Sequence, residues 1–235
     1  MMRRLPKRVW PAFALVAGAG LVYLAQGEIR AGQSLGFYQA LSVNPLPSSQ
    51  LDGDADLTAR LERSASAALW FSPYLDQACL NRLVAASGRA PDQEALKQTE
   101  ACFARLLASS PLQACSWTSL AYTRHLLGEA SQSIVSPLSI SYALGAREGR
   151  CMPLRLWTAL RLWPALPPEL QESAAQDVIL LMTSWGLRNR LIDAYLDSAP
   201  AGQKIIEGIV ARDKAIQSRF NSALKRRLRA AAPPA

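Results

Sequence analysis

Residues 167–185 read PPELQESAAQDVILLMTSW, and this stretch decides the fold class. Two prolines open it, and its apolar or small side chains then recur at regular spacings: Leu170, Ala174, Val178, Leu181 and Trp185. Steps of three and four residues follow the 3.6-residue period of an α-helix. The stretch therefore predicts a helix that begins at the prolines and turns one face toward a hydrophobic core.

Similar segments rich in Ala, Leu, Arg and Gln continue on both sides, separated by Gly and Pro. They show almost no alternation of β-branched residues, the pattern typical of strands. Glycine and proline mark helix ends, so their positions set the expected boundaries. Besides 168–185, we expect helices over 55–70, 73–88, 91–109, 112–127, 130–146, 153–163, 188–198 and 203–229. Half of the 235 residues are hydrophobic, enough for a sizeable core, and the predicted class is all-α.

The start of the chain has the layout of a membrane anchor. Basic residues dominate MMRRLPKR, and the next run, VWPAFALVAGAGLVYLAQG, carries no charge. Such a run is nearly long enough to cross the hydrocarbon layer as a helix, and the basic flank stays cytoplasmic. Ala25-Gln26-Gly27 is an alternative, signal-peptidase site that would release the rest. We therefore expect this organisation: a cytoplasmic N-terminus (1–8), a transmembrane helix (9–27), a breaker-rich linker (28–56), a helical domain (57–229) and an Ala/Pro tail (230–235).

The formal charge of +8 is concentrated at the two ends of the chain. The body between them is nearly neutral, which disfavours nucleic-acid binding. The C-terminal cluster is a candidate site for an anionic partner, such as an acidic polysaccharide, a lipid phosphate or an acidic protein. Its alternative role is a solvated helix end stabilised by the helix dipole. This cluster comprises Arg219, Lys225, Arg226, Arg227 and Arg229.

Four cysteines are present, and none forms a CxxC pair. Export would place them in an oxidising compartment, where disulfides form. Cys79 and Cys102 lie equidistant from the break at 88–91, so they face each other if the flanking helices are antiparallel. Cys115 and Cys151 would remain, near the open end of the next hairpin. The alternative is four free cysteines packed in helical interfaces.

The residues that usually carry catalysis form no recognisable constellation. The chain has no phosphate-binding Gly-rich loop, Gly-x-Ser-x-Gly elbow or His-Glu-x-x-His motif. Its single histidine, His125, is ten residues from Cys115, about 15 Å along one helix. Glu169 and Glu172 sit in a first helical turn, which the helix dipole favours without catalysis. We expect a non-enzyme with no cofactor and no metal site. A glycan-active protein using a carboxylate across helices is an alternative.

Three tryptophans in the second half of the chain have two interpretations. Trp157, Trp163 and Trp185 fall on predicted apolar helix faces, which indicates core packing. Their alternative role is contact with a partner or with the faces of sugar rings.

Part of the helical region resembles a tetratricopeptide repeat. The segment from Trp117 through Leu120 and Ala121 to the turn Leu127-Gly128-Glu129 matches that family's first helix and turn. The next helix departs from the pattern, with Ser133, Pro137 and Ile140 where small and aromatic residues are expected. The resemblance covers residues 57–150. It implies stacked helical hairpins, an α-solenoid, and no transferable groove residues.

Residues 155–170, RLWTALRLWPALPPEL, are similar to the tails of anchored repeat proteins linked with bacterial surface-polysaccharide assembly. This resemblance implies a single-pass inner-membrane protein with a periplasmic helical domain, acting as a scaffold or adaptor for envelope proteins. The alternatives are a cytoplasmic helical regulator that binds nucleic acid through its basic tail and a secreted glycan-binding protein. Reporter-fusion topology separates these classes.

Overall fold

The computed structural model describes residues 72–87 and 90–231, and every regular element in these ranges is a helix. The predicted all-α class is thus confirmed for this part of the chain. The predicted anchor 9–27, the linker 28–56 and the helix 55–70 lie outside the described residues. Within the described ranges, no helix is both long and apolar enough to cross a membrane.

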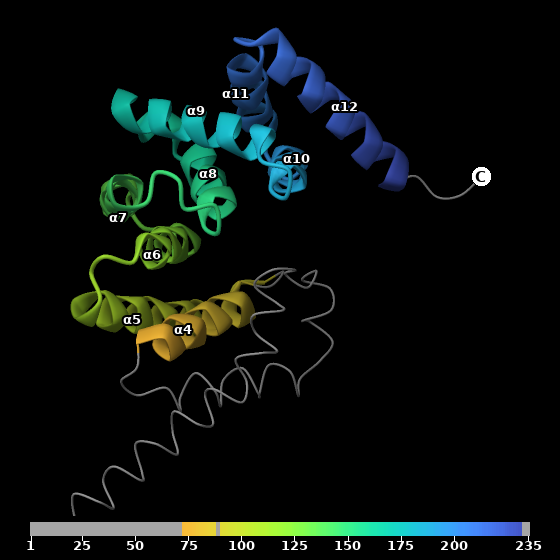
Figure 1. Cartoon of the computed structure of the whole chain (residues 1–235). Coiled ribbons are helices and arrows are strands. Elements are labelled where there is room, and N and C mark those ends of the chain that lie inside the picture. Colours follow the sequence, from red (N-terminus) through yellow and green to blue (C-terminus); the bar gives the residue numbers. More distant parts are fainter. Residues whose placement is uncertain (1–71, 88–89, 232–235) are drawn as a thin grey trace, which may run out of the picture. The chain divides into compact units, whose positions relative to one another are not determined.

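The chain divides into two compact units, one ending at Cys102 and one beginning at Phe103. Figure 1 labels the α-helices, and the chain order also includes one short 3-10 helix in the described residues. They are α4 (Ser72–Ala86), α5 (Gln93–Ser109), α6 (Ala114–Leu126), α7 (Ser131–Leu144), α8 (Met152–Arg161), the 3-10 helix η1 (Trp163–Ala165), α9 (Pro168–Thr183), α10 (Arg188–Leu196), α11 (Pro200–Val210) and α12 (Lys214–Ala231).

In the first unit, a disulfide joins α4 to α5. The Cα atoms of Cys79 and Cys102 are 5.6 Å apart, and both side chains are buried. Helix α5 begins where the sequence provides a cap: an Asp92 carboxylate oxygen accepts hydrogen bonds from the backbone N–H groups of Glu94 and Ala95. The pairing matches the one predicted from the symmetry of these cysteines about the turn.

Helices α6 and α7 form an antiparallel hairpin in the second unit. The Arg124 guanidinium donates to the Ser133 carbonyl near the turn, and the Thr118 and Ser141 hydroxyls are 2.6 Å apart further along. Sequence positions thus increase on one helix as they decrease on the other. Gly128 makes the turn with φ +74°, a left-handed conformation that glycine adopts without strain.

A second disulfide closes this hairpin onto α8. It joins Cys115, in the first turn of α6, to Cys151, the residue before α8, with Cα atoms 5.1 Å apart. The end of α7 lies beside the start of α6, so close that a Cβ added to Gly145 would collide with the Ala114 Cβ. All four cysteines are therefore paired, each pair joining helices that are close in sequence.

Helix α9 is at the centre of the second unit and contacts α7, α8, α10, α11 and α12 (Figure 1). Its predicted apolar face is largely correct: Ala174, Val178 and Leu181 are fully buried. The prediction was wrong for Trp185. The helix ends at Thr183 and Ser184 is extended, so the helical period no longer applies, and Trp185 is 90% exposed.

The predicted helix 203–229 is in fact two helices, α11 and α12, so that prediction was wrong. The break falls at Asp213, whose carboxylate accepts hydrogen bonds from the backbone N–H groups of Ala215 and Ile216. Aspartate is a strong N-cap residue, and here it starts a new helix in a new direction. This break lets α12 pack back on α9, α10 and α11.

Candidate interaction surface

One face of α12 is fixed against the core of the second unit. Ile216, Phe220 and Ala223 are buried, at spacings of four and three residues. The Phe220 ring meets the Tyr195 ring edge to face, with centroids 5.2 Å apart. These contacts set the rotation of α12 about its axis, so they also determine which side chains face solvent.

The predicted anionic-partner residues differ in their surroundings. The Arg227 guanidinium donates to the Asp193 carboxylate of α10 at 2.9 Å, and the two groups form an ion pair. Arg219, Lys225, Arg226 and Arg229 are exposed, and none of them pairs with an anionic group of the described chain. Arg227 therefore helps to hold α12 in place, while the other four charges are available to a partner.

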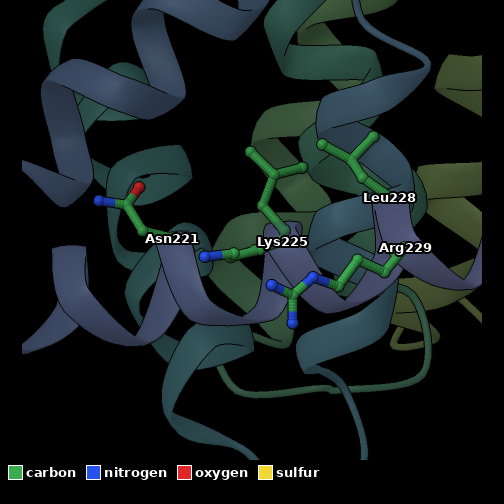
Figure 2. Close-up of a pocket in the computed structure, with 5 residues that line it drawn as sticks. Asn221, Lys225, Leu228 and Arg229 are labelled. Atoms are coloured by element: carbon green, nitrogen blue, oxygen red, sulfur yellow. The ribbon is translucent and has the colours of Figure 1, made fainter.

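A shallow groove of about 410 Å³ runs along the exposed side of α12. We call it the α12 groove, and Figure 2 shows its residues. Its lining is Asn221, Leu224, Lys225, Leu228 and Arg229. Leu228 is 53% exposed and adds apolar surface to the groove beside its cations. The groove combines cationic and aliphatic side chains, but Arg219 and Arg226 do not line it.

Trp157 is the centre of a second, aromatic cluster. The Tyr122 and His125 rings of α6 meet the Trp157 ring edge to face, with centroids 5.0 and 5.7 Å away. The Arg161 guanidinium, one turn along α8, covers the Trp157 face at 3.0 Å from the ring centroid. Edge-to-face ring pairs and cation–π contacts both stabilise packing. The cluster thus joins α6 to α8, and Arg161 occupies a face of Trp157 on which a sugar would stack.

Burial and charge shift the titration of this cluster. Burial and the nearby Arg161 both lower the pKa of His125. Burial raises the pKa of Tyr122, although Arg161 acts against the rise. Desolvation lowers the pKa of Arg161. The lowered pKa favours the neutral imidazole over a second cation beside Arg161.

The other two candidate tryptophans lie elsewhere. Trp163 is half-buried in η1 and packs against the hydrophobic core, and its carbonyl accepts a hydrogen bond from the Gln171 amide. Trp185 lies in the turn after α9, with the Arg188 guanidinium 5.8 Å from its ring centroid. The structure thus brings no two of the three tryptophans into one ring contact, and no shared sugar-binding platform joins them within the described part.

Sequence reasoning missed the most buried charge of the second unit. The Arg155 side chain is fully buried, and two of its nitrogens donate to the two oxygens of Asp177, at 2.9 and 2.7 Å. The guanidinium also donates to the Gly145 carbonyl and lies 4.2 Å from the Tyr142 ring centroid. Burial raises the pKa of Tyr142, and it pushes the pKa of Asp177 upward against the effect of Arg155. The sequence signal for this pair was Asp177, an acidic residue next to the apolar positions of α9.

The candidate catalytic residues do not meet in the described structure. Cys115 is in a disulfide and has no thiol to serve as a nucleophile. Glu172 accepts a hydrogen bond from Gln176 and lies 3.7 Å from the Arg212 guanidinium. Residues 72–87 and 90–231 hold no cluster of three His, Cys, Asp or Glu side chains able to bind a metal.

No protein-family model matches the chain, and no curated protein or solved structure is significantly similar to it.

Proposed function

We propose that this chain is a non-catalytic scaffold or adaptor of the bacterial cell envelope, with its helical domain in the periplasm. The observation that carries the proposal is that both cysteine pairs are within disulfide distance, leaving none of the four free. Disulfides persist in oxidising compartments and are rare in the cytosol. The rival proposal, a cytoplasmic regulator bound to nucleic acid, would require these buried cysteines to remain reduced.

The basic N-terminus and the uncharged residues 9–27 support an anchor in the inner membrane. By the positive-inside rule, this layout keeps residues 1–8 in the cytoplasm and exports everything after residue 27. Cleavage after the small-residue site at 25–27 would instead release a soluble periplasmic form. In both cases the helical domain reaches the same compartment.

Protein–protein interaction is the activity that the surface supports best. Helical hairpins of the tetratricopeptide-like kind stack into broad surfaces that bind protein segments. The hairpin α6–α7 has the repeat-like turn at Gly128, and the α12 groove adds exposed leucine and unpaired cations. The proposed partners are envelope proteins, including those of surface-polysaccharide assembly.

Location is tested with two reporter fusions at the C-terminus of the full chain in its native host. Alkaline phosphatase is active only outside the cytoplasm, and green fluorescent protein exported in the unfolded state stays dark. We expect phosphatase activity and no fluorescence. In parallel, the untagged chain is alkylated under denaturing conditions before and after reduction. We expect four additional labels after reduction.

Fractionation of the same cells distinguishes the anchored form from the cleaved form. A full-length chain in the membrane fraction supports the anchor, and a shortened chain in the periplasmic fraction supports cleavage. A fluorescent cytosolic fusion with fully reduced cysteines would contradict the proposed function and favour the nucleic-acid alternative.

A further inference from the structure

The α12 groove has the geometry by which helices pack side by side. Asn221, Lys225 and Arg229 are four residues apart and form one ridge along the helix, and Leu224 and Leu228 form the next ridge. Packed helices place a ridge of one in the groove between two such ridges of the other. The space between the polar ridge and the leucine ridge, whose residues Figure 2 shows, is thus the kind of groove that takes a side-chain ridge of a second helix.

The groove faces outward because α12 is held in place on its other side. Phe220 packs on Tyr195, and Arg227 pairs with Asp193. Both contacts join α12 to α10 within the second unit. A partner helix thus meets a surface whose orientation is set before binding, which lowers the entropy cost of association.

The charges of the groove specify its partner. Lys225 and Arg229 are one turn apart and have no anionic partner among the described residues. In Figure 2, the two side chains lie close together along the helix. Acidic residues spaced one turn apart on an opposing helix match this arrangement. Leu228, 53% exposed, supplies apolar area that an aliphatic side chain beside those acids covers.

The same observations favour a protein over other polyanions. The main apolar face of α12 is buried in its own core and Leu224 is partly buried against it, so Leu228 is the one large exposed apolar side chain that the described part of α12 could insert into a lipid surface. Interfacial membrane helices have a full apolar face to insert. A nucleic-acid backbone or an acidic polysaccharide would match the cations but would leave Leu228 without an apolar contact.

We propose that the α12 groove docks an acidic amphipathic helix of a partner protein. The partner's acidic residues pair with Lys225 and Arg229, and its aliphatic residues cover Leu224 and Leu228. This inference rests on the proposed adaptor function and names the partner class. In the basic cluster, Lys225 and Arg229 then contact the partner, and Arg227 holds α12 against α10. Arg219 and Arg226 lie outside the groove.

Fluorescence anisotropy with the purified full chain tests the inference. The probe is a fluorescein-labelled helical peptide with glutamates one turn apart and leucines on the adjacent ridge. A scrambled peptide of the same composition and charge is the control probe. The docking variant is Lys225→Gln/Arg229→Gln, and the matched control, Arg219→Gln/Arg226→Gln, removes the same charge from the same helix. Leu228→Ala tests the apolar ridge, and circular dichroism verifies that each variant is folded.

We expect the wild-type chain to bind the ordered probe at least about tenfold more tightly than the scrambled one. The docking variant should weaken binding by about tenfold or more, the loss of a contact central to an interface. Leu228→Ala should weaken it by about threefold or more, and the flanking control by less than about threefold, as for charges at an interface rim.

Equal losses in the docking and flanking variants would overturn the inference, because only total charge would then matter. Equal affinity for the ordered and scrambled probes would overturn it too. Tighter binding to anionic phospholipid vesicles, polygalacturonate or duplex DNA, with the same dependence on Lys225 and Arg229, would reassign the groove and refute the helix partner. The proposed function fails separately: a reduced, cytosolic chain that still binds the ordered probe would leave the groove assignment intact.

Discussion

The buried pair Arg155 and Asp177 gives a prediction whose size follows from the structure. The two side chains are 0% and 1% exposed, and their shortest contact is 2.7 Å. Replacing Arg155 with Met keeps an apolar stem of similar length but leaves the carboxylate buried without its counter-charge. Such a loss costs about 3–5 kcal/mol of unfolding free energy. Arg155→Met also removes a hydrogen bond to the Gly145 carbonyl, so we expect about 4 kcal/mol in total.

The reverse variant, Asp177→Leu, should cost a similar amount, because the guanidinium is then the uncompensated charge. The double variant Arg155→Met/Asp177→Leu removes both charges and should lose only about 1–2 kcal/mol, mainly from the unpaired backbone carbonyl groups. The difference between the summed losses of the single variants and the loss of the double variant is the coupling energy of the pair, and we expect it to be about 6 kcal/mol. Urea unfolding of the full chain, followed by helical circular dichroism, provides all three values.

Arg212→Met is the matched control for the loss of an arginine. Its guanidinium is 66% exposed and 3.7 Å from Glu172, so its removal should change stability by less than about 1 kcal/mol. If Arg155→Met does not fold at all, recovery of folding in the double variant carries the same information. Additive losses in the double variant, or a cost below about 1 kcal/mol for Arg155→Met, would refute the claim that these charges are desolvated and coupled.

Three further predictions concern the disulfides, the histidine and an exposed tryptophan. Each disulfide closes a loop, with sequence separations of 23 and 36 residues. Loss of either disulfide should lower the free energy of unfolding by about 3–4 kcal/mol, slightly more for the longer loop. Urea unfolding of variants in which both cysteines of one disulfide are replaced by alanine measures this loss. The pKa of His125 is lower in the folded state than in the unfolded state, so the unfolded chain binds its proton more readily, and stability should fall as the pH drops through the usual histidine range near 6.5. Because His125 is the only histidine, His125→Gln should flatten this part of the pH–stability curve, and an unchanged slope would contradict the assignment. Trp185 is the most exposed tryptophan of the described residues, so Trp185→Ala should change stability by less than about 0.5 kcal/mol and reduce the fraction of fluorescence that iodide quenches. An unchanged quenched fraction would contradict the exposure of this indole.

Local patterns predicted much of the helical framework. The α9 face and the prolines and glycines that end helices act within a few residues, so they can be read directly from the chain. The cysteine pairing follows from the same information, because each pair joins helices close in sequence. The membrane anchor and the repeat relationship remain predictions, as does periplasmic location.

The prediction for Trp185 was wrong because the helix ends at Thr183 and Ser184 is extended. The spacing of apolar residues does not specify the residue at which a helix ends. The prediction of one long last helix was wrong because Asp213 caps a new helix, and no glycine or proline marks that break in the sequence. Arg155 was missed for a different reason: a buried arginine requires a carboxylate from another helix, and Asp177 is 22 residues away in sequence.

The sequence by itself determined the helical class, most of the approximate helix boundaries and the concentration of positive charge in the last helix, and it offered the cysteine pairing beside the alternative of free thiols. These properties depend on residue type and on spacings of a few positions, which folding does not alter. The tertiary structure alone decided which charges are used internally. Arg227 and Lys225 are two residues apart, yet packing on α10 turns one toward Asp193 and the other into the groove. The rotation of α12 sets that difference, and it is fixed by contacts with distant residues.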